Sequence, residues 1–232
     1  RLDVAAVRAL RLAEPPAPPG VARGQAMSTP EYWRQATRDL AERDAVLRGL
    51  IERFRGLALA SRGDAFTTLA RSIVGQQISV KAAQSVWDRL SGRLVAVTPT
   101  SVCRGRSSTL RACGLSGQKA SYLKDLSRRF LDGTLDPGSW NALDDEALIQ
   151  EMTQVRGIGR WTAEMFLMFH LARPDVLPLA DLGLQRAMRL HYNRGRALSD
   201  ARMRKIGATW APWRSVATWY LWRSLDPIPV EY

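Results

Sequence analysis

A helical pattern that repeats along most of the chain is the feature that most restricts its fold. From residue 28 onward, polar residues that can cap a helix precede stretches in which apolar residues recur three and four positions apart. This spacing puts apolar side chains on one helix face, and a Ser, Thr or Asp at the start can accept hydrogen bonds from free backbone amides. The predicted helix starts are Ser28, which forms a capping box with Glu31, and Asp64, Ser79, Ser116, Asp144 and Ser199, with Pro212 in the first turn of a last helix.

Strand character is nearly absent from the sequence. Residues 93–97 form the one candidate, and because they are few and lie between two predicted helices, we expect an extended loop there. We therefore predict an all-α fold. Residues 1–27 differ from the rest, since a short helical pattern at 4–12 is followed by a Pro-rich stretch at 15–20 that cannot continue a helix. We expect them to form an appendage to one domain that spans residues 28–232.

The chain is strongly basic, with a formal net charge of +12 and a sequence pI of about 10.7. Such a charge favours a polyanionic partner, although charge alone does not separate DNA from RNA or from an acidic membrane surface. The segment from residue 181 to residue 214 holds seven arginines and one lysine against two aspartates. This segment is therefore the predicted phosphate-facing surface, and a solvated, arginine-rich helix exterior is the alternative.

Several classes of protein are disfavoured by what the sequence contains. It has no stretch of roughly 20 apolar residues that could span a membrane, and the first 26 residues hold no hydrophobic signal core, so we expect a soluble protein of the bacterial cytoplasm or the eukaryotic nucleus. Cys103 and Cys113 are too few for a disulfide framework or a four-cysteine metal centre, and we expect both to be reduced. His170 and His191 are too few for a zinc centre and are interpreted as structural or surface residues.

The most informative stretch is EALIQEMTQVRGIGRWTAEMFLMF, which predicts a helix, a tight turn at residues 153–160 and a second helix. Gly157 and Gly159 permit positive φ and close backbone approach, so the amides that open the second helix could face a phosphate. Two glycines between helices are also common in ordinary turns. Asp181, 22 residues after Gly159, directly precedes another helical pattern, and an aspartate there is equally expected as a simple helix cap.

Taken together, these stretches resemble the helix-hairpin-helix DNA glycosylase superfamily. VRGIGRWTAEMF with VLPLADLGLQRAMRL is similar to the 3-methyladenine DNA glycosylase II branch, as are ARSIVGQQISVKAAQSVWDRL and PWRSVATWYLWR. The resemblance covers about residues 40–225 and points to a compact form, because the chain has no sequence for the N-terminal α/β domain of the founding enzymes. It implies two helical subdomains, one at about 62–140 and one made of 28–61 and 141–232, with a DNA-binding cleft between them.

The resemblance implies a monofunctional glycosylase that flips alkylated purines out of double-stranded DNA and hydrolyses the N-glycosidic bond. Asp181 would be the catalytic carboxylate, stabilising the positive charge that develops on the sugar. Bifunctional relatives carry a lysine nucleophile where this chain has Trp161, so we expect no lyase activity and an intact abasic site as product. The missing cysteine cluster argues against the iron–sulfur branches.

Further roles also follow from the resemblance. Trp161 and Trp222 are expected to wall the base pocket with Met165, which occupies a position that is aromatic in some relatives. Gln77 and Ile78 lie in the loop that would insert a wedge into the duplex. We expect DNA contacts from Gly157, Gly159, Arg160 and Arg186, no cofactor other than Na⁺ or K⁺ held by the main-chain carbonyls of Thr153, Val155 and Ile158, and action as a monomer.

Two other interpretations remain open from the sequence. The chain could be a DNA-binding module without catalysis, in which Asp181 only caps a helix, or a glycosylase for an oxidised guanine or another lesion. The shape of the pocket decides among 3-methyladenine, 7-methylguanine, 1-methyladenine and etheno adducts, and the sequence does not reveal it.

Overall fold

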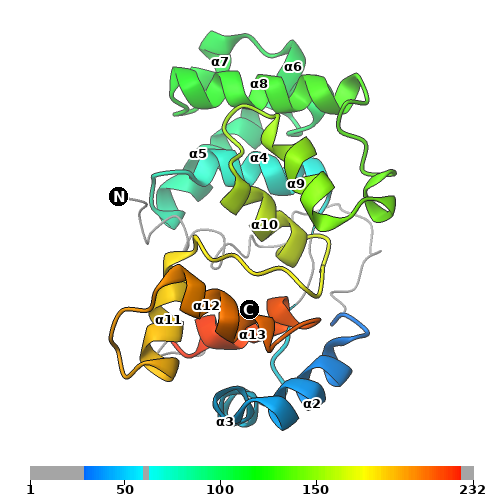
Figure 1. Cartoon of the computed structure of the whole chain (residues 1–232). Coiled ribbons are helices and arrows are strands. Elements are labelled where there is room, and N and C mark those ends of the chain that lie inside the picture. The colour runs from blue at the N-terminus through cyan, green and yellow to red at the C-terminus, as the bar shows by residue number, and fades with distance from the viewer. Residues whose placement is uncertain (1–28, 60–62, 226–232) are drawn as a thin grey trace. The chain divides into compact units, whose positions relative to one another are not determined.

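A computed structural model describes residues 29–59 and 63–225 of the chain. This part is helical and contains no strand, which confirms the predicted all-α fold (Figure 1). None of its helices is long and apolar enough to cross a bilayer. The helices are α2 (Trp33–Arg43), α3 (Ala45–Arg53), α4 (Ala65–Gly75), α5 (Val80–Leu94), α6 (Pro99–Arg104), α7 (Ser107–Ala112), α8 (Gly117–Leu131), the 3₁₀ turn η1 (Trp140–Ala142), α9 (Asp145–Thr153), α10 (Arg160–Phe169), α11 (Leu182–Tyr192), α12 (Asp200–Ala208) and α13 (Arg214–Arg223).

Most of the predicted helix starts are confirmed by side-chain caps. The carboxylate of Asp64 accepts a hydrogen bond from the amide of Thr67 at 2.9 Å, and that of Asp144 accepts one from Ala147 at 2.7 Å. Ser79, Ser116 and Ser199 cap α5, α8 and α12 in the same way. These starts were predictable because an N-cap bond is closed within a few residues.

Three local predictions need comment. Arg93 and Leu94 belong to the last turn of α5, and only then does the chain leave the helix, at Val95, with φ +66°. Pro212 lies before the first turn of α13, because Trp213 is the N-cap of that helix. Ser28, with the appendage at residues 1–27, lies outside the described residues, and α2 begins without a side-chain cap.

The chain divides into two compact units, which are described separately. Among the described residues, unit 1 comprises 63–166, and unit 2 comprises 29–59 and 167–225. We expected residues 141–166 to belong to the second subdomain, whereas the structure assigns them to unit 1. The reason is their bonding, since Trp140 donates to the Glu151 carboxylate at 3.0 Å and packs edge-on against Phe166 at 5.4 Å.

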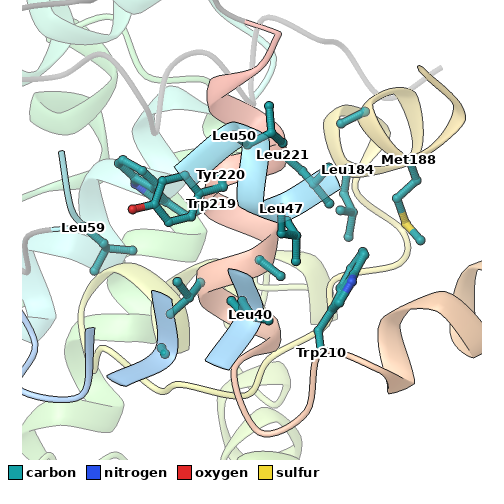
Figure 2. Packing of buried hydrophobic residues seen from close by; sticks show 14 of the residues in the cluster. Leu40, Leu47, Leu50, Leu59, Leu184, Met188, Trp210, Trp219, Tyr220 and Leu221 are labelled. Atoms are coloured by element: carbon teal, nitrogen blue, oxygen red, sulfur yellow. The ribbon is translucent and has the colours of Figure 1, made fainter. Parts of the chain in front are cut away.

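Unit 2 has a core of leucine and aromatic side chains. Figure 2 shows Leu40, Leu47, Tyr220 and Leu221 in one cluster around α13, and all four side chains are buried. Trp210 is fully buried, and Trp219 meets Trp33 edge-on with 5.3 Å between ring centroids. The crowding of tryptophans near the C-terminus therefore serves mainly to fill this core, as tryptophan usually does.

Candidate active site

Asp181 is the N-cap of α11 in unit 2. Its Oδ1 accepts a hydrogen bond from the amide of Leu184 at 2.6 Å and another from the indole Nε1 of Trp222 at 2.7 Å. The side chain is 1% exposed, and both of these partners are polar donors. The predicted cap and the predicted functional carboxylate are therefore the same group, held in one orientation at the positive end of a helix dipole.

The loop that leads to Asp181 is attached along α13. The guanidinium of Arg214 donates two hydrogen bonds of 2.7 Å to the Asp175 carboxylate, in the bidentate geometry that this group favours. The next residue of α13, Ser215, donates its amide to the carbonyl of Pro174 at 3.0 Å, and its Oγ accepts from the amide of Val176 at 2.9 Å. The loop is thus fixed to α13 at its start by these bonds and at its end by Trp222.

Trp222 joins the carboxylate to an aromatic stack. Its ring lies nearly parallel to that of Phe169, with centroids 5.7 Å apart and planes tilted by 15°. Phe169 was not among the predicted site residues, because an isolated Phe in an apolar helix gives no signal beyond core packing. Unit 2 therefore brings together a carboxylate, an indole that donates to it, and a second aromatic ring.

The predicted hairpin lies in unit 1 between α9 and α10. Gly157 adopts φ +87°, and a side chain on it would collide with the ring of Tyr122 in α8. Two backbone amides of the turn are already bonded. The amide of Ile158 donates to the carbonyl of Val155 at 3.0 Å, and the amide of Arg156 donates to the buried Asp125 carboxylate at 3.0 Å. Glycine is required at 157 because a Cβ would collide with the ring of Tyr122, in a backbone conformation that already disfavours side chains.

Gly159 differs from Gly157. A Cβ built on it would meet nothing within 4 Å, and its φ is not in the left-handed region. Its carbonyl accepts from Ala163 in the first turn of α10. The space in front of Gly159 is thus open in the protein itself, as a position facing a phosphate would require.

The predicted wedge loop follows α4 and is bonded to the hairpin. Gln77 is exposed and holds φ +59°, a conformation that residues other than glycine rarely adopt. The neighbouring Gln76 donates Nε2 to the carbonyl of Gly157 at 2.7 Å. Lys119 of α8 donates Nζ to the carbonyls of Val74, at 2.8 Å, and Gln76. Sequence reasoning selected Gln77 and Ile78 and missed Gln76 and Lys119, whose partners are distant along the chain.

The other predicted residues occupy varied surroundings. Arg160 forms two bonds of 2.8 and 2.7 Å with Glu146 and one of 3.1 Å with Glu164, and these bonds raise the pKa of its guanidinium. A phosphate would therefore compete with carboxylates for Arg160, while Arg186 is exposed on α11. Trp161 is partly exposed, and Met165 is buried.

Comparison with known proteins shows the family to which the chain belongs. The HhH-GPD superfamily of base excision DNA repair proteins matches residues 70–212, which span the wedge loop, the hairpin and Asp181. The chain belongs to this superfamily. It is 32% identical over 180 residues to DNA-3-methyladenine glycosylase 1 of Schizosaccharomyces pombe, covering 75% of this chain and 78% of that one.

Solved structures agree with the HhH-GPD assignment. A DNA-3-methyladenine glycosidase from Bacillus halodurans superposes with a TM-score of 0.79 and 31% identity, covering 90% of this chain and 96% of that one. A 3-methyladenine DNA glycosylase from S. pombe, solved in complex with abasic DNA, superposes with a TM-score of 0.70 and 29% identity. The match covers 82% of this chain and 96% of that one. The predicted 3-methyladenine branch and base excision glycosylase function are confirmed.

The metal ligands predicted at the hairpin of this HhH-GPD chain are main-chain carbonyls. No group of three or more His, Cys, Asp or Glu side chains suited to a metal occurs in the described ranges. The carbonyls of Thr153, Val155 and Ile158 lie in and beside the turn, and such neutral oxygens suit a hard cation. His191 lies elsewhere, with Nε2 2.8 Å from the Ser224 hydroxyl, and burial lowers its pKa.

Proposed function

We propose that this HhH-GPD chain hydrolyses the N-glycosidic bond of alkylated purines of the 3-methyladenine type in duplex DNA, with Asp181 as its catalytic carboxylate. The observation that carries the proposal is the pair of donors that fix Asp181 Oδ1, the amide of Leu184 and the indole of Trp222. A carboxylate oriented in this way is preorganised to stabilise a cationic sugar.

The reaction that Asp181 would support is hydrolysis of the N-glycosidic bond. The bond between the sugar C1′ and the purine nitrogen breaks, its electron pair leaves with the base, and positive charge develops on the sugar. Water then adds to C1′ and loses a proton. An alkylated purine already carries positive charge, so it departs as a neutral molecule and needs less help from a general acid than an unmodified base does.

The aromatic rings supply recognition of such a base. Trp222 and Phe169 form a parallel stack beside Asp181, and Trp161 is the further ring that we assign to the base pocket. An electron-rich ring face attracts a cationic base more than a neutral one. Met165 is buried and, in this proposal, leaves the pocket with one aromatic wall fewer than some relatives have.

We assign the contacts with the DNA backbone to the hairpin and to Arg160 and Arg186. In the hairpin, the backbone amides near Gly157 and Gly159 would face a phosphate. Gln77, on its strained backbone, is assigned as the wedge, with Ile78 beside it. Carbonyls of Thr153, Val155 and Ile158 would hold Na⁺ or K⁺, which would supply positive charge next to that phosphate. The chain acts as a monomer in this proposal.

Replacing Asp181 with Asn tests the central claim. Asparagine still caps a helix and its amide oxygen can still accept from Trp222, so the fold should survive. We expect release of 3-methyladenine from methylated duplex DNA to fall by about 100-fold or more, the usual effect of removing a key charge-stabilising group, while DNA binding persists. Undiminished release by Asp181→Asn would reduce Asp181 to a helix cap.

The kind of base and the product are tested separately. Mass spectrometry of bases released by the unaltered protein should detect methylated purines and not oxidised guanine. Because residue 161 is Trp and offers no amine for a Schiff base, strand breaks should appear only after alkali. Direct strand cleavage, or trapping of a covalent adduct by borohydride, would show a lyase activity that this proposal excludes.

A further inference from the structure

Unit 1 carries a second strongly basic region, whose arginines all precede α8. From Arg89 to Lys124 the chain contains five arginines and two lysines and no Asp or Glu. The segment includes the end of α5, all of α6 and α7, and part of α8, and Figure 1 shows α6 and α7 lying along α8. Arg89, Arg93, Arg104, Arg106 and Arg111 are all exposed.

In the described part of the chain, these arginines lack the carboxylate partners that several other arginines have. Arg156, Arg160 and Arg214 all lie within ion-pair distance of Asp or Glu side chains. Within residues 29–59 and 63–225, no such ion pair involves Arg89, Arg93 or Arg106. Among the described residues no carboxylate is thus ion-paired with these three arginines, and their charge is available to an external anion.

The structure also places two of these arginines, Arg89 and Arg93, beside a depression. A pocket of about 390 Å³ is lined by Arg89, Gly92 and Arg93 of α5 and by Thr109 and Ala112 of α7, together with Cys113. Arg89 is held in place because its Nε donates to the carbonyl of Cys113 at 2.9 Å. Arg106 does not line the pocket, but it is the N-cap of α7, the helix that carries Thr109 and Ala112.

Within this region, α6 is separated from the hairpin by α8. Tyr122 and Asp125 of α8 contact the hairpin, whereas Lys124 donates to the carbonyl of Cys103 in α6 at 3.2 Å. Helical residues advance by roughly 100° each, so Lys124 faces nearly the opposite direction from Tyr122. The hairpin and α6 thus occupy opposite sides of one helix.

We propose that Arg89, Arg93 and Arg106 form a second DNA-backbone site, which binds duplex phosphates outside the lesion and adds to non-specific affinity. We call these residues the arginine pocket. Paired guanidinium groups and a hydroxyl match phosphate oxygens, and no Asp or Glu is among the described residues that line the pocket. The inference concerns undamaged DNA and does not depend on the assignment of Asp181.

The test compares binding of an undamaged duplex across a range of KCl concentrations by fluorescence anisotropy. The variant Arg89→Gln/Arg93→Gln/Arg106→Gln should lower the slope of log K against log salt by about two to three, since each phosphate contact contributes about 0.9. Arg93→Gln/Arg106→Gln keeps the Arg89 bond to Cys113 and should lower the slope by about one to two. It thereby guards against a folding defect in the triple variant.

The matched control removes the same charge from unit 2, at the exposed Arg34, Arg38 and Arg55. Arg34→Gln/Arg38→Gln/Arg55→Gln should change the slope by less than half as much. Equal changes in control and pocket variants would show a general charge effect and overturn the proposal, as would an unchanged slope in the double variant. Base release at saturating DNA should stay unchanged in the pocket variants, so a failure of the glycosylase assignment remains distinguishable.

Discussion

At the scale of single residues, the proposed function gives Trp222 a part in both recognition and chemistry. Its indole N–H fixes the oxygen of Asp181 that the helix amide also holds, and its ring face stacks on Phe169. The two functions use different parts of one side chain. A substitution can therefore remove the hydrogen bond while an aromatic ring is kept.

Trp222→Phe is expected to slow base release at saturating DNA by about tenfold to a hundredfold. The reason is the loss of a hydrogen bond to a charged group, which contributes about 1.5–3 kcal/mol. Single-turnover kinetics would measure the rate. Phe169→Leu is the matched control, since it removes a ring from the stack but leaves the N–H of Trp222 on Asp181. If Trp222→Phe released base at the unaltered rate, the indole bond would have no role in the reaction.

At the scale of elements, the hairpin is shaped by its neighbours as much as by its own sequence. Tyr122 and Asp125 of α8 contact its turn, and Gln76 donates to the carbonyl of Gly157 from the loop after α4. Lys119 in turn holds the carbonyl of Gln76. The hairpin and the wedge loop are consequently one bonded structure within unit 1.

The two hairpin glycines should respond differently to alanine. Gly157→Ala places a Cβ against Tyr122 at positive φ and should lower the free energy of unfolding by about 1 kcal/mol or more. Gly159→Ala meets open space, so its thermal unfolding should match that of the unaltered protein. Its new methyl group should instead hinder a phosphate and weaken binding to undamaged duplex. A Gly159→Ala protein that bound DNA normally would contradict the assignment of this turn to the backbone contact.

At the scale of the whole molecule, unit 2 contains three tyrosines whose pKa values are raised by burial. Burial raises the pKa of Tyr32 to about 12 and raises those of Tyr192 and Tyr220 as well. Asp44, which accepts bonds from the Tyr192 hydroxyl at 2.8 Å and from Trp210 at 3.1 Å, adds to the shift at Tyr192. Each of these hydroxyls is thus favoured in its neutral form by folding.

Unit 2 should therefore lose stability in alkali. A raised pKa in the folded state means that the stabilisation is complete below pH 10, the ordinary tyrosine value, and declines as pH rises toward the folded value, about 12 for Tyr32. Urea unfolding followed by tryptophan fluorescence from pH 9 to 12 would measure this decline. Tyr32→Phe loses the bond to the Ala172 carbonyl but should flatten the pH dependence. An equally steep dependence in that variant would exclude Tyr32 as a contributor.

The sequence by itself determined the helices, the order of the motifs and the superfamily. Caps such as Asp64 and Ser116 and the apolar spacing act over a few residues, so they are legible without a fold, and Gly157 and Asp181 stand at recognisable distances along the chain. The tertiary structure decided what pairs across long separations: Trp222 with Asp181, Phe169 with Trp222, Gln76 with Gly157, and residues 141–166 with unit 1. These contacts depend on which surfaces meet after the helices pack, and no local pattern encodes that choice.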